Sequence, residues 1–426
     1  MNIEVRGGRI VDPRSGVDRV ASLFVADGRI AAIGKEPAAW RQDRVLDAHG
    51  LVVAPGLIDI AVRLREPGLE YRATLHSEMH AAVAGGVTSL ACMPDTDPPL
   101  DEPGLVEMLK YRARSLNQGR VYPVGALTVG LEGETLTQMG ELAEAGCIAF
   151  SHAERPLIDT TVLLRALEYA NTFGYRVWLR AQDAYLARLG VAHEGEVATR
   201  LGLAAIPAAA ETIALGTLFA LVRETGAALH VCRLSTAVGV DMMRAAKGEG
   251  LQVTCDVGVH HLHLCDVDIG WFDPLCRLSP PLRSVRDRAA LAAGLADGTI
   301  DLVCSDHTPV DDDGKQLPFA EADPGATGLE LLLPLTLGWA ARERVPLQEA
   351  LARITSRPAD VLGVDAGSLA VGAPADVCVF DPDERWVVTR ESLRSQGKNT
   401  PFLGVEVQGR VRHTLVAGDM VYDARR

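Results

Sequence analysis

The feature that most constrains the fold is an alternation of short apolar runs and helix-like segments between about residues 55 and 362. Strand-like runs lie at 88–93, 146–150, 176–179, 228–232, 252–255 and 300–304, and Ala-, Glu- and Leu-rich stretches such as 237–247 separate them. Such repeated units are typical of parallel strands joined by helical crossovers. A segment of about 300 residues built this way predicts a (β/α)8 barrel. An open doubly wound sheet is the alternative, but no GxGxxG motif follows a strand.

Both ends of the chain have a different pattern, with short strands and tight turns. In the N-terminal part, residues 1–54, Asp27-Gly28 separates two apolar runs, which is a strong hairpin signal. In the C-terminal part, residues 366–426, a strand-like run at 375–380 precedes a second turn at 417–419. Because an isolated hairpin is barely stable, we expect the two ends to form one small β-sandwich module beside a barrel at 55–362.

Charge and cysteine content exclude several classes of protein. The 426 residues include 42 Lys and Arg against 56 Asp and Glu, a net charge of −14, which argues against a nucleic-acid binder. No apolar run reaches membrane-spanning length, and the first residues lack the layout of a signal peptide. The eight cysteines form no CxxC pair, so we expect reduced thiols in a cytoplasmic protein.

Several motifs together resemble the dihydroorotases of the amidohydrolase superfamily, which open or close the dihydroorotate ring. The family stretch PGLIDxHVHLREPG corresponds to residues 55–68, and AxxGGFTTxxxMPNTxP to 82–99. Further matches lie at 260–262, 280–283 and 305–309, so that the resemblance covers nearly the whole chain. It implies an α/β fold with the barrel, and a centre of one or two zinc ions that activates water at the carboxyl ends of the strands.

The residues that would hold this metal have changed. The resemblance places the ligands at six positions, occupied here by Ala61, Arg63, His152, Arg180, Arg233 and Asp306. Only Asp306 keeps the residue of the family, whose other ligands are histidines and a bridging carboxylate. A catalytic zinc needs three protein ligands, so we expect no metal and no other cofactor.

The positions that would contact substrate are only partly retained. Arg65 matches the arginine that grips the substrate carboxylate in the family. Asp95 and Ser279 stand where the family has asparagines, and a carboxylate at 95 would repel an anionic substrate.

Three arginines at former ligand positions predict an ionic cluster in place of the metal. We expect Asp306 to be buried within about 4 Å of at least one of them, with Asp183 and Glu154 as further carboxylates. The pairing should lower the pKa of Asp306. Replacing Asp306 with alanine should then destabilise the fold by roughly 3–5 kcal/mol.

The resemblance also implies a role and partners. We expect a catalytically inactive dihydroorotase homologue of pyrimidine synthesis, a structural subunit that assembles with the aspartate transcarbamoylase catalytic subunit and also self-associates. The alternative is an active dihydroorotase, or a related cyclic-amide hydrolase, with an atypical or absent metal centre. Residues 311–325 are polar and end at Pro324-Gly325, so we expect a mobile, lid-like loop there.

Overall fold

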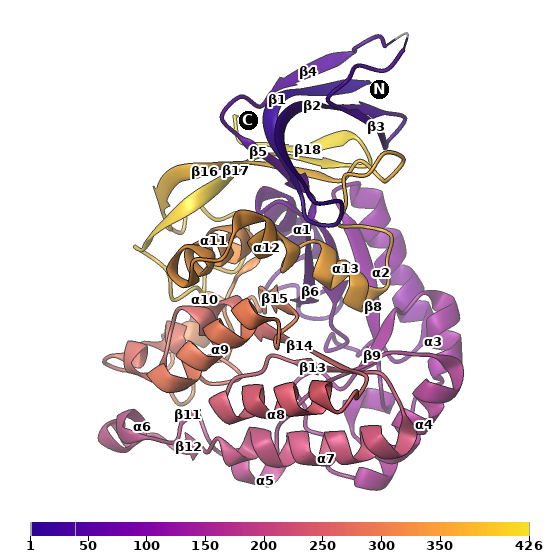
Figure 1. The fold of residues 1–426 in the computed structure, drawn as a ribbon. Helices are drawn as coiled ribbons and strands as arrows, with labels where there is room; N and C mark the ends of the chain where they lie inside the picture. Colours follow the sequence, from indigo (N-terminus) through magenta and orange to yellow (C-terminus); the bar gives the residue numbers. More distant parts are fainter. Residues whose placement is uncertain (1, 39, 426) are drawn as a thin grey trace.

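The structure is a computed structural model that describes residues 2–38 and 40–425. A barrel forms its larger part, and a β-module built from both ends of the chain lies at one side of the barrel (Figure 1). This arrangement confirms the fold class predicted from the alternating pattern and the turn-rich ends.

Eight parallel strands form the barrel, in the order in which they occur along the chain. They are β6 (Leu57–Val62), β7 (Val87–Cys92), β8 (Arg120–Ala126), β9 (Ala149–Ser151), β10 (Val177–Arg180), β13 (Leu229–Cys232), β14 (Val253–Gly258) and β15 (Leu302–Cys304). The first and last strands meet where Val62 pairs with His307 just beyond β15. The hydrogen bonds from Arg63 N to His307 O and from His307 N to Ala61 O close the ring at this end.

A helix follows each barrel strand and covers the outside of the sheet (Figure 1). These helices are α1 (Leu75–Ala84), α2 (Pro103–Leu116), α3 (Met139–Ala145), α4 (Thr160–Phe173), α7 (Ala209–Thr225), α8 (Ala237–Gly248), α9 (Val285–Asp297) and α11 (Leu332–Glu343). Side chains cap several of them at the start. Asp159 accepts from Thr161 N at the start of α4, and Ser284 forms a capping box with Asp287 in α9.

Shorter elements occupy the connections between strands and helices. They are α5 (Ala184–Ala187), α6 (Glu196–Leu201), α10 (Asp312–Gln316), α12 (Leu347–Ala352), α13 (Ser356–Leu362), the two-residue strands β11 (Ala192–His193) and β12 (Ala205–Ile206), and the 3₁₀ turns η1 (Val129–Leu131), η2 (Val259–Leu262), η3 (Asp266–Ile269), η4 (Pro274–Cys276) and η5 (Leu329–Leu331). The connections that lead from the barrel strands to the helices lie at the carboxyl end of the barrel, where they surround the candidate site.

The β-module is one eight-stranded sheet to which both ends of the chain contribute. Its order is β18 (Asp419–Asp423), β17 (Glu406–Val416), β16 (Val377–Val387), β5 (Val52–Pro55), β1 (Ile3–Asp12), β2 (Val17–Ala26) and β3 (Arg29–Ile33), with β4 (Arg44–Asp47) also paired to β1. A bulge in β1 lets its two halves pair with different strands, so that the sheet encloses its own apolar core.

The two hairpin turns foreseen in the sequence pack against each other. Asp27 and Gly28 both adopt positive φ between β2 and β3. A Cβ atom on Gly28 would lie 2.9 Å from the carbonyl oxygen of Ala417 in the second turn. Glycine therefore allows the N-terminal and C-terminal hairpins to meet.

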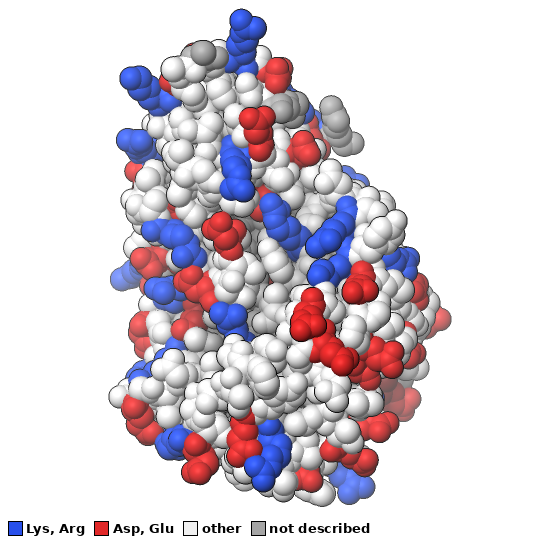
Figure 2. Space-filling model, turned by 90° about the vertical axis from the view of Figure 1, so that its right-hand side faces the viewer, with Lys and Arg blue, Asp and Glu red and all other residues white. Residues whose placement is uncertain are grey.

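Acidic and basic side chains are interspersed over the face shown in Figure 2, where several basic side chains border the hollow in its middle. This face carries no continuous basic stripe, in keeping with the net charge of −14. None of the helices described is long and apolar enough to cross a lipid bilayer.

Candidate functional site

Four side chains predicted to converge do so at the carboxyl end of the barrel. Arg180 is the last residue of β10, and Arg63, Arg233 and Asp306 follow β6, β13 and β15 within two residues. Asp306 is buried, and its Oδ1 lies 2.9 Å from Arg233 Nη1 and 3.3 Å from Arg63 Nη1. The predicted ion pair of Asp306 with these arginines is therefore present.

Glu154, three residues beyond β9, is the centre of the cluster. Its Oε1 accepts from Arg63 Nη2 at 2.5 Å and also from Arg233 Nη1, while its Oε2 pairs with Arg180 Nη1. The three guanidinium groups are 6% exposed or less, and the Glu154 side chain is 30% exposed. One carboxylate thus holds together three cations that would otherwise repel one another. We call Arg63, Arg180, Arg233, Glu154 and Asp306 the ionic cluster.

The two carboxylates of the ionic cluster differ in their pKa. Burial acts to raise the pKa of Glu154, but the charges of Arg233, Arg180 and Arg63 outweigh it and hold this pKa well below its usual range. Burial raises the pKa of Asp306 despite Arg233 and Arg63, and the nearby Glu154 carboxylate adds to the rise. The prediction that pairing lowers the pKa of Asp306 is wrong, because desolvation and a second anion exceed the effect of the two cations.

Asp95 and Ser279, expected as remnants of substrate binding, contact the ionic cluster instead. Asp95 Oδ2 accepts from Arg63 Nε at 2.7 Å. Ser279 Oγ accepts from Arg180 Nη1 at 2.6 Å and lies 3.1 Å from Glu154 Oε2, to which it donates. The carboxylate at position 95 therefore neutralises an arginine at the site.

Arg65 lies beside the ionic cluster and is buried without an ion pair among the described residues. Its Nε donates to the carbonyl oxygen of Pro309 at 3.0 Å. Burial lowers the pKa of Arg65 to about 10, although Asp95 acts in the opposite direction.

The other predicted residues do not add ligands or charges to the ionic cluster. Ala61 offers only a methyl group. His152 is buried, and its ring nitrogens bond to Thr128 Oγ1 at 2.9 Å and to the carbonyl oxygen of Arg155 at 2.8 Å. Asp183 caps the start of α5 with its side chain. The prediction of Asp183 as a partner of the arginines is therefore wrong, since helix capping uses its carboxylate.

These side chains do not fit the zinc centre that the resemblance implies. Of the six former ligand positions, only His152 and Asp306 carry groups that bind zinc, and both are already hydrogen-bonded within the protein. The three arginines direct positive charge toward the place of a dication. Zinc needs at least three protein ligands, so no catalytic step is assigned to a metal here.

The segment 311–325, expected as a mobile lid, is fastened to its own barrel. It contains α10, and within it Phe319 is buried and Lys315 donates from Nζ to the carbonyl oxygens of Pro274 at 3.0 Å and Arg277 at 3.1 Å. Burial lowers the pKa of Lys315 to about 7. Phe319 packs with apolar side chains of the connection after β14, among them Ile269 and Cys276, and this anchoring of the segment was not foreseen from its polar start.

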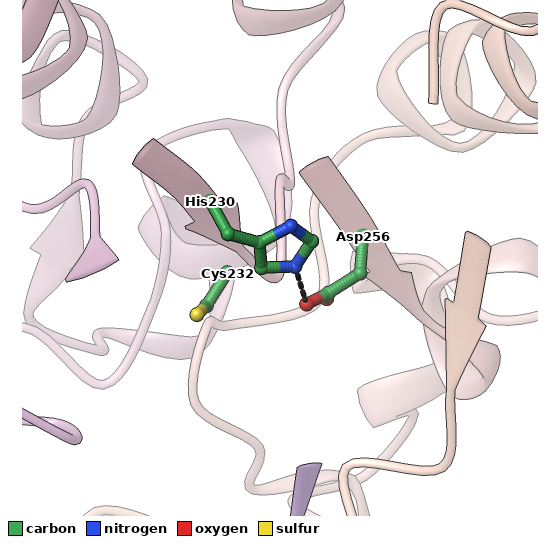
Figure 3. Close-up of side chains that lie close together, drawn as sticks. All are labelled: His230, Cys232 and Asp256. Atoms are coloured by element: carbon green, nitrogen blue, oxygen red, sulfur yellow. Dashed lines mark hydrogen bonds and ion pairs between the residues drawn. The ribbon is translucent and has the colours of Figure 1, made fainter. Parts of the chain in front are cut away.

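A second group of possible metal ligands lies deeper in the barrel, where His230, Cys232 and Asp256 approach within 4.8 Å of one another (Figure 3). His230 Nε2 bonds to Asp256 Oδ2 at 2.9 Å, and its Nδ1 bonds to Thr254 Oγ1 at 2.8 Å. Burial raises the pKa of the Cys232 thiol. With both ring nitrogens engaged and the thiol protonated, this group is a buried hydrogen-bonded pair beside a cysteine.

Comparisons with known proteins agree with this architecture. The profile of the Dihydro-orotase-like family matches residues 50–238, and that of the Amidohydrolase family matches 160–422. The chain is 43% identical to a dihydroorotase-like protein of Pseudomonas aeruginosa, covering 99% of this chain and all of that one. It is 41% identical to a dihydroorotase of Geobacter sp. (strain M21), over the full length of both.

The chain belongs to the dihydroorotase-like amidohydrolases. In structure it is similar to the L-hydantoinase (dihydropyrimidinase) of Arthrobacter aurescens, with a TM-score of 0.88 and 26% identity over 99% of this chain and 96% of that one. The fold of this dihydroorotase-like protein is thus that of its relatives, while the residues at the carboxyl end of the barrel make up an ionic cluster.

Replacing Asp306 with asparagine in this dihydroorotase-like protein should cost only about 1–2 kcal/mol of unfolding free energy. Burial raises the pKa of Asp306, so that the site favours its charge less than water does, and Arg63 and Arg233 both keep Glu154 as a partner. Urea unfolding at pH 7 measures the change. A loss above about 4 kcal/mol, the size found for a broken buried pair, would show that Arg63 and Arg233 depend on the charge of Asp306 and would contradict this expectation.

Proposed function

We propose that this protein is a dihydroorotase homologue that does not hydrolyse cyclic amides, needs no zinc or other cofactor, and serves as a structural subunit of an aspartate transcarbamoylase complex. The observation that carries this proposal is the ionic cluster, in which three arginines replace histidines at former ligand positions. Glu154 and Asp306 are both held by arginines, so neither is free to take a proton from water.

Two features support a structural role in a cytoplasmic assembly. All eight cysteines are free and buried, as suits a reducing compartment. The connection between β14 and α9 exposes large apolar side chains, with Trp271 89% exposed and Val267 51% exposed. Exposed aromatic groups of this size are common at protein interfaces, and we propose that the protein binds the transcarbamoylase catalytic subunit and further copies of itself through such surfaces.

An active enzyme is the second candidate. Relatives that are 41% and 42% identical along the full chain are named dihydroorotase, and Arg65 retains a buried cationic side chain beside the site. Arginines could polarise a substrate carbonyl, although this mechanism still lacks a group that makes hydroxide at pH 7.

An assay with added Zn²⁺ separates the two candidates. The purified protein is incubated with dihydroorotate to follow ring opening and with the open-chain product to follow ring closure, beside a catalytically competent dihydroorotase. We expect no turnover above the uncatalysed rate in either direction. A turnover number of about 1 s⁻¹ or more, an ordinary enzymatic rate, would establish the enzymatic alternative.

Copurification tests the structural role separately. Tagged protein is expressed together with the aspartate transcarbamoylase catalytic chain of the same organism, and the complex is analysed by size-exclusion chromatography with light scattering. We expect the two chains to elute together and a Trp271→Ser variant to bind less well, while Tyr111→Ser, an exposed aromatic on α2, binds as the parent does. Separate elution of the two parent chains would contradict the proposal.

A further inference from the structure

A cavity of about 330 Å³ lies at the end of the barrel opposite the ionic cluster. Its wall includes residues at the beginnings of β10, β13 and β14, together with residues of α13. Parallel strands begin at the same end of a barrel, so this is the amino-terminal mouth. The volume is in the range of cavities that hold small molecules.

Positive charge is in excess at this cavity. Arg176 and Arg357 both line it, and neither forms an ion pair within residues 2–38 and 40–425. Two carboxylates also line it, but each already has a cationic partner. Asp301 accepts from Lys247 Nζ at 2.6 Å, and Asp360 accepts from Arg14 Nη2 at 2.6 Å; neither is left to neutralise the two arginines.

The guanidinium of Arg176 is seated against the end of α13. A Cβ atom on Gly363, the residue that ends this helix, would lie 2.4 Å from Arg176 Nη2. Gly363 has a φ of +70°, which favours glycine, and its missing side chain leaves the space that the guanidinium uses. Local backbone geometry thus determines where this cation lies.

The inner wall of the cavity is aromatic. Trp178 and His230 both line it, with ring centroids 5.5 Å apart. Trp178 is only 1% exposed, and its Nε1 donor has no acceptor among the described residues. His230 is held by Asp256, as Figure 3 shows, and by Thr254, which also lines the cavity. The two buried rings thus close the inner end of the cavity.

We propose that this cavity binds a small organic anion, whose phosphate or carboxylate group pairs with Arg176 and Arg357 and whose apolar part packs on the half-buried Leu251 and Val361 of the lining. Guanidinium groups bind both kinds of anion through paired hydrogen bonds, and the apolar part of the lining favours an apolar body. The site opens at the opposite end of the barrel from the ionic cluster, and it does not depend on whether the protein has hydrolytic activity.

Isothermal titration calorimetry at low ionic strength tests the proposal, with phenyl phosphate, phenylacetate and inorganic phosphate as probes. We expect at least one of the two aromatic anions to bind with a Kd of about 1 mM or below. The tighter of the two identifies the anionic group, and inorganic phosphate should bind more weakly because it lacks the apolar part.

Variants locate the binding. Arg176→Ala and Arg357→Ala should each weaken binding of the preferred probe by about tenfold, the loss expected for one charged hydrogen-bonding partner. Arg200→Ala removes an exposed arginine on α6 and should leave the Kd unchanged. The proposal is overturned if the parent binds neither aromatic anion at about 10 mM, if inorganic phosphate binds as tightly, or if the double variant at 176 and 357 binds like the parent.

Discussion

Replacing Glu154 with glutamine is expected to lower the free energy of unfolding by about 3 kcal/mol at pH 7. The change keeps the size of the side chain but removes the charge that three guanidinium groups share. We place the effect at the lower end of the range for buried pairs, since the Glu154 side chain is 30% exposed. Urea unfolding measures it. Glu168→Gln is the matched control, because it breaks a surface pair with Arg165 and should cost less than about 0.5 kcal/mol.

The decrease in unfolding free energy caused by Glu154→Gln should depend on pH in a defined direction. The folded protein holds the pKa of Glu154 below the unfolded value of about 4.3. Its contribution to stability is therefore fully present above that value and is lost as the pH falls through the folded pKa. The difference in unfolding free energy between parent and variant should stay constant between about pH 6 and 8 and become smaller below about pH 4. A constant difference down to about pH 3 would show that Glu154 is not stabilised as an anion.

Replacing Arg233 with methionine is expected to cost about 3–5 kcal/mol at pH 7. Arg233 is 2% exposed and lies between the two carboxylates, with Nη1 bonded to Glu154 and 2.9 Å from Asp306. Methionine fills much of the same volume but leaves both anions with fewer cations. Position 233 has a φ of +53°, which strains arginine and methionine alike, so the substitution does not change the backbone strain. Arg244→Met, which removes two exposed ion pairs, serves as the control and should cost below about 1 kcal/mol.

The stability of Arg233→Met should rise on mild acidification, the reverse of the trend for Glu154 in the parent. Without Arg233, burial and mutual repulsion raise the folded pKa of Asp306 further above its unfolded value of about 3.9. A group of this kind adds stability that is fully present below the unfolded pKa and is lost as the pH rises through the folded pKa. The variant should therefore be closer to the parent at pH 5 than at pH 8. If the variant instead loses more unfolding free energy relative to the parent as the pH falls from 8 to 5, the assigned arrangement of charges is wrong.

The fold was predictable because local pattern and global architecture agree. Each strand-like run in the middle of the sequence is a barrel strand, and the turns at Asp27-Gly28 and 417–419 form the hairpins of the β-module. The convergence of Arg63, Arg180 and Arg233 was also predictable, since the resemblance places these three positions around one metal centre at the carboxyl ends of the barrel strands.

The charge balance within the site was less accessible from the sequence. Glu154 and Asp183 both follow barrel strands closely. The side chain of Glu154 reaches the arginines, whereas that of Asp183 caps α5, and this difference depends on the local backbone at each residue. The pKa of Asp306 is raised by burial and lowered by the neighbouring arginines. The sequence alone does not give the distances that decide which effect is larger. The available signal was the acidic residue Glu154, two residues after His152, the position where the resemblance places the bridging carboxylate of the family.

The ionic cluster also affects whether single substitutions could build a metal centre in this barrel during evolution. Arg63, Arg180 and Arg233 share Glu154, so changing any one of them to histidine removes a cation before enough ligands exist to hold a metal. Each early step would lower stability and return no activity, and the effects of the substitutions would be strongly non-additive. If the proposed function holds, a zinc centre would then be difficult to reach in this barrel by single substitutions.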